Sequence, residues 1–145
     1  MESKENQEKM KKIRRIMNRC CDKSLSVRRY TIEERSVEDG MYLLMFVYNV
    51  KNEILEARIA SYDDMIEIAE KIRAKSRIHI NQCDSIAHYI AEEYGMRCIV
   101  NVIHYRKDIL KVTLSHDKGI KIIQGTYSDI IDDLRYRKVI NHENR

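Results

Sequence analysis

The side chains of this sequence that are best suited to chemistry are cations that could contact phosphate groups. One set falls within the first 30 residues and consists of Lys11, Lys12, Arg15, Arg19, Arg28 and Arg29. A second set falls between residues 97 and 121 and consists of Arg97, Tyr105, Lys107, Lys111 and Lys121. Because lysine, arginine and tyrosine supply the phosphate and sugar contacts that position a protein on nucleic acid, we predict that both sets bind nucleic acid.

The net charge of +4 is distributed unevenly along the chain. Residues 1–30 carry ten Lys or Arg against four Asp or Glu, and residues 97–125 carry six against two. Residues 31–96 are acidic, with seven basic against thirteen acidic side chains. Since partners respond to local fields over about 10 Å at physiological salt, the basic parts favour an acidic partner. The alternative is that the basic N-terminal helix neutralises the acidic middle, in the same chain or in a neighbouring copy.

The sequence lacks the motifs of common enzyme classes. Its four glycines are too scattered for a P-loop or a dinucleotide-binding loop. It has no CxxC or HExxH spacing for a metal and no GxSxG nucleophile elbow. The strongest enzymatic candidates are Asp64 and Asp129 acting with a metal, but each is expected near a helix start, where a carboxylate is favourable anyway. We therefore expect a non-enzymatic protein that uses no cofactor and no metal.

The cysteines and the hydropathy pattern favour a cytoplasmic protein. The four cysteines, at positions 20, 21, 83 and 98, are either adjacent or far apart and do not suggest a disulfide framework. No apolar run approaches the ~20 residues that a membrane span needs. We expect no membrane partner. Cys83 is expected in the protein core, with His79 and His88 exposed.

Hydrophobic periodicity predicts four helices and six strands. The helices are expected over residues 5–22, 62–75, 80–94 and 127–139. The strands are expected over residues 27–36, 41–50, 53–60, 97–105, 108–115 and 119–125. The run 41–50 is apolar on both faces, as in a central buried strand. The predicted fold class is α+β, with two antiparallel three-stranded meanders and about four helices.

Alternation within the second meander predicts which side chains its two faces carry. The exposed face is expected to present Asn101, Ile103, Tyr105, Lys111, Thr113, Ser115, Lys121 and Ile123. The core face is expected to take Val100, Val102, Leu110, Val112, Leu114, Ile120 and Ile122. Lysine, tyrosine, asparagine and threonine on one exposed sheet suit phosphate contact with some base contact.

The two halves of the chain echo each other at an offset of 65 residues. The sequence SYDDMIE at 61–67 corresponds to TYSDIID at 126–132, and both follow a third strand. The echo predicts an internal αβββα duplication, with chance similarity of two helix starts as the alternative. The expected organisation is a basic amphipathic helix over 1–24, a βββα unit over 25–77, an αβββα unit over 78–139 packed on the first as one compact domain, and a tail over 140–145.

Each half also has topological resemblances to nucleic-acid-binding modules. A three-stranded sheet followed by a helix resembles the arm-type DNA-binding modules of phage-like integrases, which place such a sheet in the major groove. The chain lacks their glycine-bearing turn and dense basic third strand, so no residue role is transferred. The αβββα order is similar to double-stranded-RNA-binding domains, but the helix starts at 61–64 and 126–129 are acidic and would repel phosphate.

The sequence thus predicts a non-enzymatic nucleic-acid-binding protein, with DNA as the favoured partner. Its size and lack of catalytic motifs suit an accessory or regulatory protein of a phage or mobile element. The alternative is a small inhibitor or adaptor that binds a host protein through a charged surface, such as a phage counter-defence protein. In that case the acidic segment 33–93 would imitate phosphate. A homodimer is compatible with both interpretations.

Overall fold

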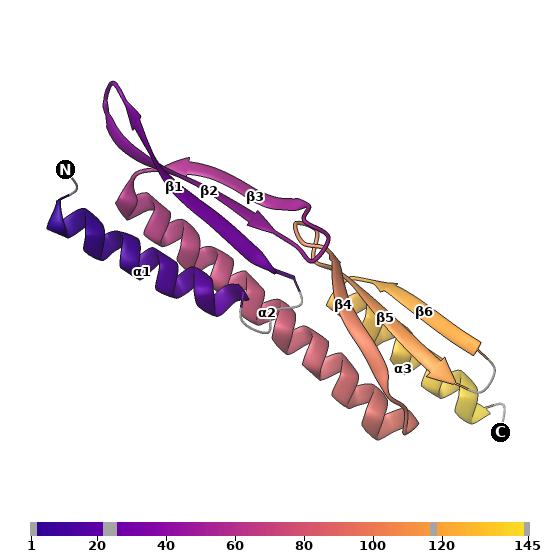
Figure 1. The fold of residues 1–145 in the computed structure, drawn as a ribbon. Helices are drawn as coiled ribbons and strands as arrows, with labels where there is room; N and C mark the ends of the chain where they lie inside the picture. Colours follow the sequence, from indigo (N-terminus) through magenta and orange to yellow (C-terminus); the bar gives the residue numbers. More distant parts are fainter. Residues whose placement is uncertain (1–2, 22–25, 117–118, 144–145) are drawn as a thin grey trace. The chain divides into compact units, whose positions relative to one another are not determined.

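A computed structural model of the chain describes residues 3–21, 26–116 and 119–143, and the side chains among them up to residue 136 except that of residue 116. Within these ranges the chain forms three helices and six strands, which confirms the predicted α+β class (Figure 1). Their order is α1 (Lys4–Cys21), β1 (Arg29–Val37), β2 (Gly40–Tyr48), β3 (Ile54–Ala60), α2 (Tyr62–Tyr94), β4 (Cys98–His104), β5 (Ile109–His116), β6 (Gly119–Gly125) and α3 (Tyr127–Glu143). The chain divides into two compact units, unit 1 (Met1–Ile78) and unit 2 (His79–Arg145).

Unit 1 contains an antiparallel sheet of order β1-β2-β3, and helices cover one face of this sheet (Figure 1). The apolar stripe of α1 is buried because its residues recur every three or four positions. The buried side chains of the helices are Ile13, Ile16, Met17 and Cys20 in α1 and Tyr62, Met65, Ala69 and Ile72 in α2. Alternate residues of β2 complete this core, namely Leu43, Met45 and Val47, all with 0% exposure.

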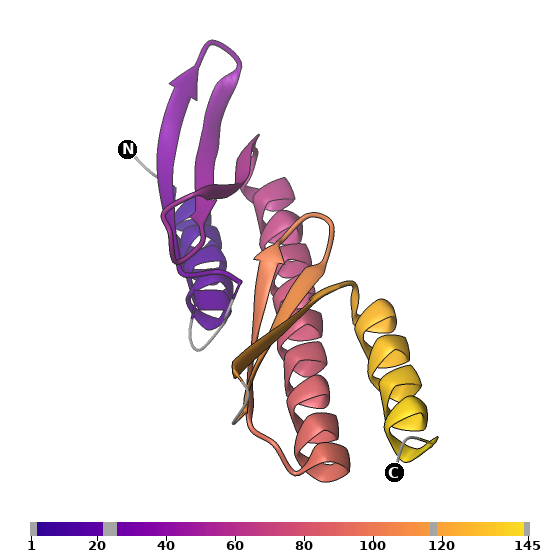
Figure 2. The same cartoon turned by 90° about the vertical axis from the view of Figure 1, so that its right-hand side faces the viewer.

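Unit 2 repeats this plan with sheet order β4-β5-β6. Figure 2 shows α3 running alongside the second part of α2 within this unit. Its core combines both helices with alternate strand residues. The buried residues are Cys83, Ile86 and Ile90 of α2, Val100, Leu110, Val112, Leu114 and Ile123 of the sheet, and Ile130 and Leu134 of α3.

The expected break between helices 62–75 and 80–94 is wrong, because α2 is one helix of 33 residues. The helix contains no glycine and no proline, so nothing in it removes a backbone hydrogen bond or favours a turn. Ser76 and His79, which lie where the break was expected, are buried. The helix ends at Tyr94. The following Gly95 has a φ of 63° and donates its N–H to the Ala91 carbonyl at 3.0 Å, which forms a left-handed cap.

The third strand and the following helix start obey the 65-residue offset in both units. β3 spans Ile54–Ala60 and β6 spans Gly119–Gly125, while α2 and α3 begin at Tyr62 and Tyr127. Both helices are capped by the preceding hydroxyl: the Asp64 N–H donates to Ser61 Oγ at 3.2 Å and the Asp129 N–H to Thr126 Oγ1 at 3.3 Å. Duplication as the origin of this likeness, and the packing of the units into one compact domain, stay predictions.

Candidate nucleic-acid interface

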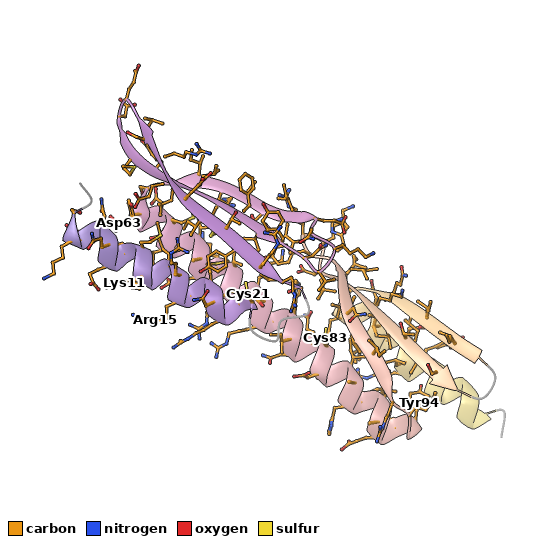
Figure 3. All side chains as sticks on the ribbon, in the orientation of Figure 1. Lys11, Arg15, Cys21, Asp63, Cys83 and Tyr94 are labelled. Carbon is orange, nitrogen blue, oxygen red and sulfur yellow. The ribbon has the colours of Figure 1, made fainter. Side chains whose placement is uncertain are left out.

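Four of the predicted cations, Lys11, Lys12, Arg15 and Arg19, lie on the exposed side of α1, and this set is called the basic face below. Burial of the opposite stripe of the helix against the core forces these side chains outward. Lys11, Arg15 and Arg19 follow one another at four-residue spacing, about 6 Å apart along the axis. Figure 3 shows Lys11 and Arg15 on the side of α1 that faces away from the sheet.

The acidic residues of unit 1 leave the basic face largely uncompensated. Lys11 approaches Glu8 of its own helix at 3.7 Å, with both side chains well exposed. Among the residues that the structure describes, no carboxylate lies within ion-pair distance of Lys12, Arg15 or Arg19. Contact between α1 and the acidic middle is made by Lys9, whose Nζ lies 3.0 Å from Asp63. That hydrogen bond, with a second one to Glu5, raises the pKa of Lys9.

Two further predicted cations, Arg28 and Arg29, lie where β1 begins. Arg28 is exposed, and its charge opposes the rise that burial causes in the pKa of Cys21 at the end of α1. The Arg29 guanidinium lies 3.8 Å from the centre of the Tyr48 ring, and its Nε donates to Asn52 Oδ1 at 3.1 Å. Arg28 therefore lies near the end of α1, whereas Arg29 is held over the sheet.

The predicted cations of unit 2 do not gather on one surface. Arg97 is exposed before β4, and Lys107 is exposed in the turn after β4, where its N–H donates to His104 Nδ1 at 3.3 Å. Lys111 lies at the centre of the sheet between Asn101 and Gln124. Lys121 pairs with the core residue Leu114 and so points to the opposite face of the sheet from Lys111.

The predicted faces of β6 are inverted. Ile123 was expected on the exposed face but is 6% exposed, whereas Ile120 and Ile122, expected in the core, are 70% and 50% exposed. The register of β6 causes this, because the His116↔Gly119 pair places Ile123 opposite Val112 in the core. Isoleucines on both sides of this strand could not reveal that choice, since a one-residue slip exchanges the faces.

The placement of Tyr105 on the exposed sheet face is also wrong. Tyr105 follows β4 and is 4% exposed, with its ring edge-on to that of His79 at 5.7 Å between centres. His79, expected to be exposed, is 1% exposed, and its Nε2 lies 2.7 Å from Asp108 Oδ1. Burial of the histidine is possible because this carboxylate satisfies one ring nitrogen. His88 is exposed as expected and lies 3.0 Å from Glu92.

Sequence reasoning missed an aromatic surface on unit 1. The interpretation of 41–50 as a strand buried on both faces is wrong, because Tyr42, Leu44, Phe46 and Tyr48 are only half-buried. They alternate with the core residues of β2 and lie on the face away from the helices, which we call the open face of unit 1. The Phe46 and Tyr48 rings lie 6.4 Å apart. The signal was present in the sequence, since every aromatic residue in the strand has an even number.

The open face of unit 2 has a different composition. Its exposed apolar residues are aliphatic, namely Ile99, Ile103, Ile120 and Ile122. Its polar residues lie mainly in the row formed by Asn101, Lys111 and Gln124. This surface resembles the expected one in carrying Lys111 and Asn101, but it is far more apolar.

The described residues offer little for metal or thiol chemistry. In these parts of the chain, no group of three or more His, Cys, Asp or Glu is placed to hold a metal ion. All four cysteines are free, and burial raises the pKa of Cys20 and of Cys83 to about 11. No helix within the described ranges is long and apolar enough to cross a membrane. Asp64 and Asp129 lie in the first turns of α2 and α3, where a carboxylate stabilises the N-terminus of the helix.

Comparison of the chain with protein families, with curated proteins and with solved structures found no match.

Proposed function

We propose that this protein binds nucleic acid without catalysing a reaction, and that the basic face of α1 makes the phosphate contacts. The observation that carries the proposal is the row of Lys11, Arg15 and Arg19, with Lys12 beside it, on the exposed side of one rigid element. The phosphate groups of double-stranded DNA carry one negative charge about every 3.4 Å along each strand. Cations about 6 Å apart along a helix therefore face a closely spaced row of negative charges.

The charge distribution within unit 1 supports this proposal over internal neutralisation. Several acidic residues of the sheet have local partners: Glu33 lies 2.7 Å from Arg35, and Glu56 lies 3.6 Å from Arg58. Glu34 accepts a hydrogen bond from the Tyr62 hydroxyl. The charges on the basic face are therefore available to an acidic partner. A role in a phage or mobile element stays a prediction.

Charge reversal tests the proposal directly. The variant Lys11→Glu, Lys12→Glu, Arg15→Glu and Arg19→Glu should weaken binding to a mixed-sequence oligonucleotide by about a hundredfold or more, because it replaces attraction by repulsion. The matched control reverses Arg97, Lys107, Lys111 and Lys121, which changes the net charge equally. It should weaken binding much less, because those cations are scattered over both faces and a turn.

A second variant guards against loss of the helix itself. New glutamates at four-residue spacing repel one another along α1, so the same four positions are also changed to glutamine. The glutamine variant should keep its helical circular dichroism and lower the log–log salt slope by about 0.7–0.9 for each phosphate group that the protein no longer neutralises. If affinity and salt slope match those of the wild type while the thermal midpoint falls, α1 serves folding and the proposal is wrong.

The open face of unit 2 favours one second candidate, a protein–protein inhibitor or adaptor. Exposed isoleucines grouped on one sheet face are typical of a protein contact, and Ile99 and Ile122 are adjacent to Thr113 in one row across the sheet. This candidate would replace the first if the purified protein carries no nucleic acid and the basic-face variants bind as the wild type does.

A further inference from the structure

The rings on the open face of unit 1 have a spacing that suits nucleic-acid bases. Phe46 and Tyr48 are two residues apart on β2 and their ring centres are 6.4 Å apart. That distance is close to twice the ~3.4 Å spacing of nucleotides along a strand. Tyr42 continues the same side of the strand on the other side of Leu44.

The neighbours of Phe46 leave space beside its ring. Phe46 pairs with Thr31 on β1 and with Ala57 on β3, and both of these short residues are exposed. The opposite side of β2 faces the helices, where Leu43, Met45 and Val47 are fully buried. The core therefore fixes the strand while a flat ligand has room beside the Phe46 ring.

Charge around the open face favours phosphate at the Tyr48 end. Arg29 lies over the Tyr48 ring and is held by Asn52, and Arg28 precedes it. Arg28 lies near Cys21, the last residue of α1. Glu33 lies on this face too, but Arg35 pairs with it at 2.7 Å.

From these observations we infer that the open face of unit 1 stacks unpaired bases, so that the nucleic acid crossing it is single-stranded. This inference rests on the proposed function and adds the class of nucleic acid. Every base offers a flat π surface, and stacking on aromatic side chains is tolerant of sequence. A duplex hides those surfaces, so duplex DNA would engage only the basic face.

Three probes separate stacking from phosphate contact. They are an oligothymidylate of about twelve nucleotides, within the ~4–16 that a small single-strand-binding fold covers, an abasic oligomer of the same length, and a duplex of that length. The test variant is Phe46→Leu with Tyr48→Leu, which keeps apolar side chains on the strand. The control is Tyr136→Leu, which removes an exposed ring on α3. The rescue is Phe46→Tyr with Tyr48→Phe, which keeps both rings.

The leucine variant should lose affinity for oligothymidylate by about tenfold for each ring that stacks. Its affinity for the abasic oligomer and its salt slope should not change, because the cations remain. The control and the rescue variants should bind as the wild type does. A ribothymidylate oligomer of equal length differs from oligothymidylate only in the ribose 2′-hydroxyl and shows whether that hydroxyl adds affinity, while loss of stacking should appear with both sugars.

A measurement on the unmodified protein makes the test independent of how the variant folds. Phe46 is the only phenylalanine in the chain, so its ring resonances are unambiguous. Addition of oligothymidylate should shift them upfield, and the abasic oligomer should not. Equal affinity of the wild type for both oligomers, or unmoved Phe46 resonances at saturation, would overturn the inference.

The remaining outcomes distinguish the two proposals. If basic-face reversal abolishes binding of every probe and the leucine variant binds normally, the proposed function stands and this inference fails. If the wild type binds none of the probes, both fail. If the leucine variant dissociates a dimer seen by sedimentation without affecting oligothymidylate, the open face is a protein contact and the inference is wrong.

Discussion

The two sheets share a strand order and a buried layer, yet their open faces differ. Each is an antiparallel meander with helices on one side and a central strand that buries alternate residues. On the other side, β2 presents Tyr42, Phe46 and Tyr48 with Arg29 over one ring, whereas the sheet of unit 2 presents four isoleucines around Lys111. The two units are alike in their buried cores, which folding requires, and differ in their open faces, which are available to partners.

This contrast separates the positions at which the two units agree from those at which they differ. Core positions are constrained by packing, so both units fill them mainly with apolar residues. Open-face positions are free of that constraint, so the two units can present different chemistry on equivalent strands. Under the proposed function, unit 1 would contact nucleic acid, and the aliphatic open face of unit 2 would suit a protein contact.

The largest effects should come from the shared core, where the two units ought to behave alike. Leu43 and Leu110 are fully buried in the central strands β2 and β5. Leu43→Ala and Leu110→Ala should each lower the free energy of unfolding by about 2–5 kcal/mol through reduced burial and a residual cavity. Denaturant titration measures this, with Ile59→Thr and Ile122→Thr as exposed controls. A cost under about 1 kcal/mol in either unit would show that the two cores are not equivalent.

The reactivity of the buried thiols provides a second comparison of the two units, with a smaller expected effect. Burial raises the pKa of Cys20 in unit 1 and of Cys83 in unit 2 to about 11. Their alkylation rates should therefore rise about tenfold per pH unit up to about pH 11, while Cys21 and Cys98, whose burial is partial, react faster at pH 8. Mass spectrometry of timed alkylation distinguishes the four. A plateau below pH 9 for either buried thiol would contradict the burial.

The same raised pKa values set the direction of a stability change. The folded state holds these two thiol protons to higher pH than the unfolded chain does, whose ordinary cysteine pKa is about 8.5. Below pH about 8.5 the two protonated thiols therefore contribute their full stabilisation of the folded state. That stabilisation is lost as the pH rises through about 11.

The smallest effect compares the two helix caps. Ser61 and Thr126 each accept a hydrogen bond from the N–H three residues later. Ser61→Ala and Thr126→Ala should each cost about 1 kcal/mol of folding free energy. Exchange of the hydroxyl residues, Ser61→Thr and Thr126→Ser, should cost less than half as much. A cap that matters in only one unit would break the structural equivalence of the two helix starts.

Much of this structure could be predicted from the sequence because its signals are local. The α1 stripe, the strand alternation and the Ser61 and Thr126 caps depend on neighbours a few residues away. The outward direction of Lys11, Lys12, Arg15 and Arg19 was predictable for the same reason, since one buried stripe fixes the rest of a helix. The α+β class followed from the order of these elements.

Only the tertiary structure decided which face of each strand is covered and where helix periodicity continues. The faces of 120–123 depend on the register of β6 with β5, which isoleucines on both sides of a strand do not specify. The even-numbered side of β2 is only half-buried because unit 1 has helices on one face of its sheet (Figure 1). The sequence groups the aromatic residues on that side, but only the layering leaves the side without a helix. Likewise, His79 is buried where Asp108, 29 residues away, meets its ring, and α2 is continuous through this position. Local periodicity determines what an element is, whereas long-range pairing determines what each of its sides touches.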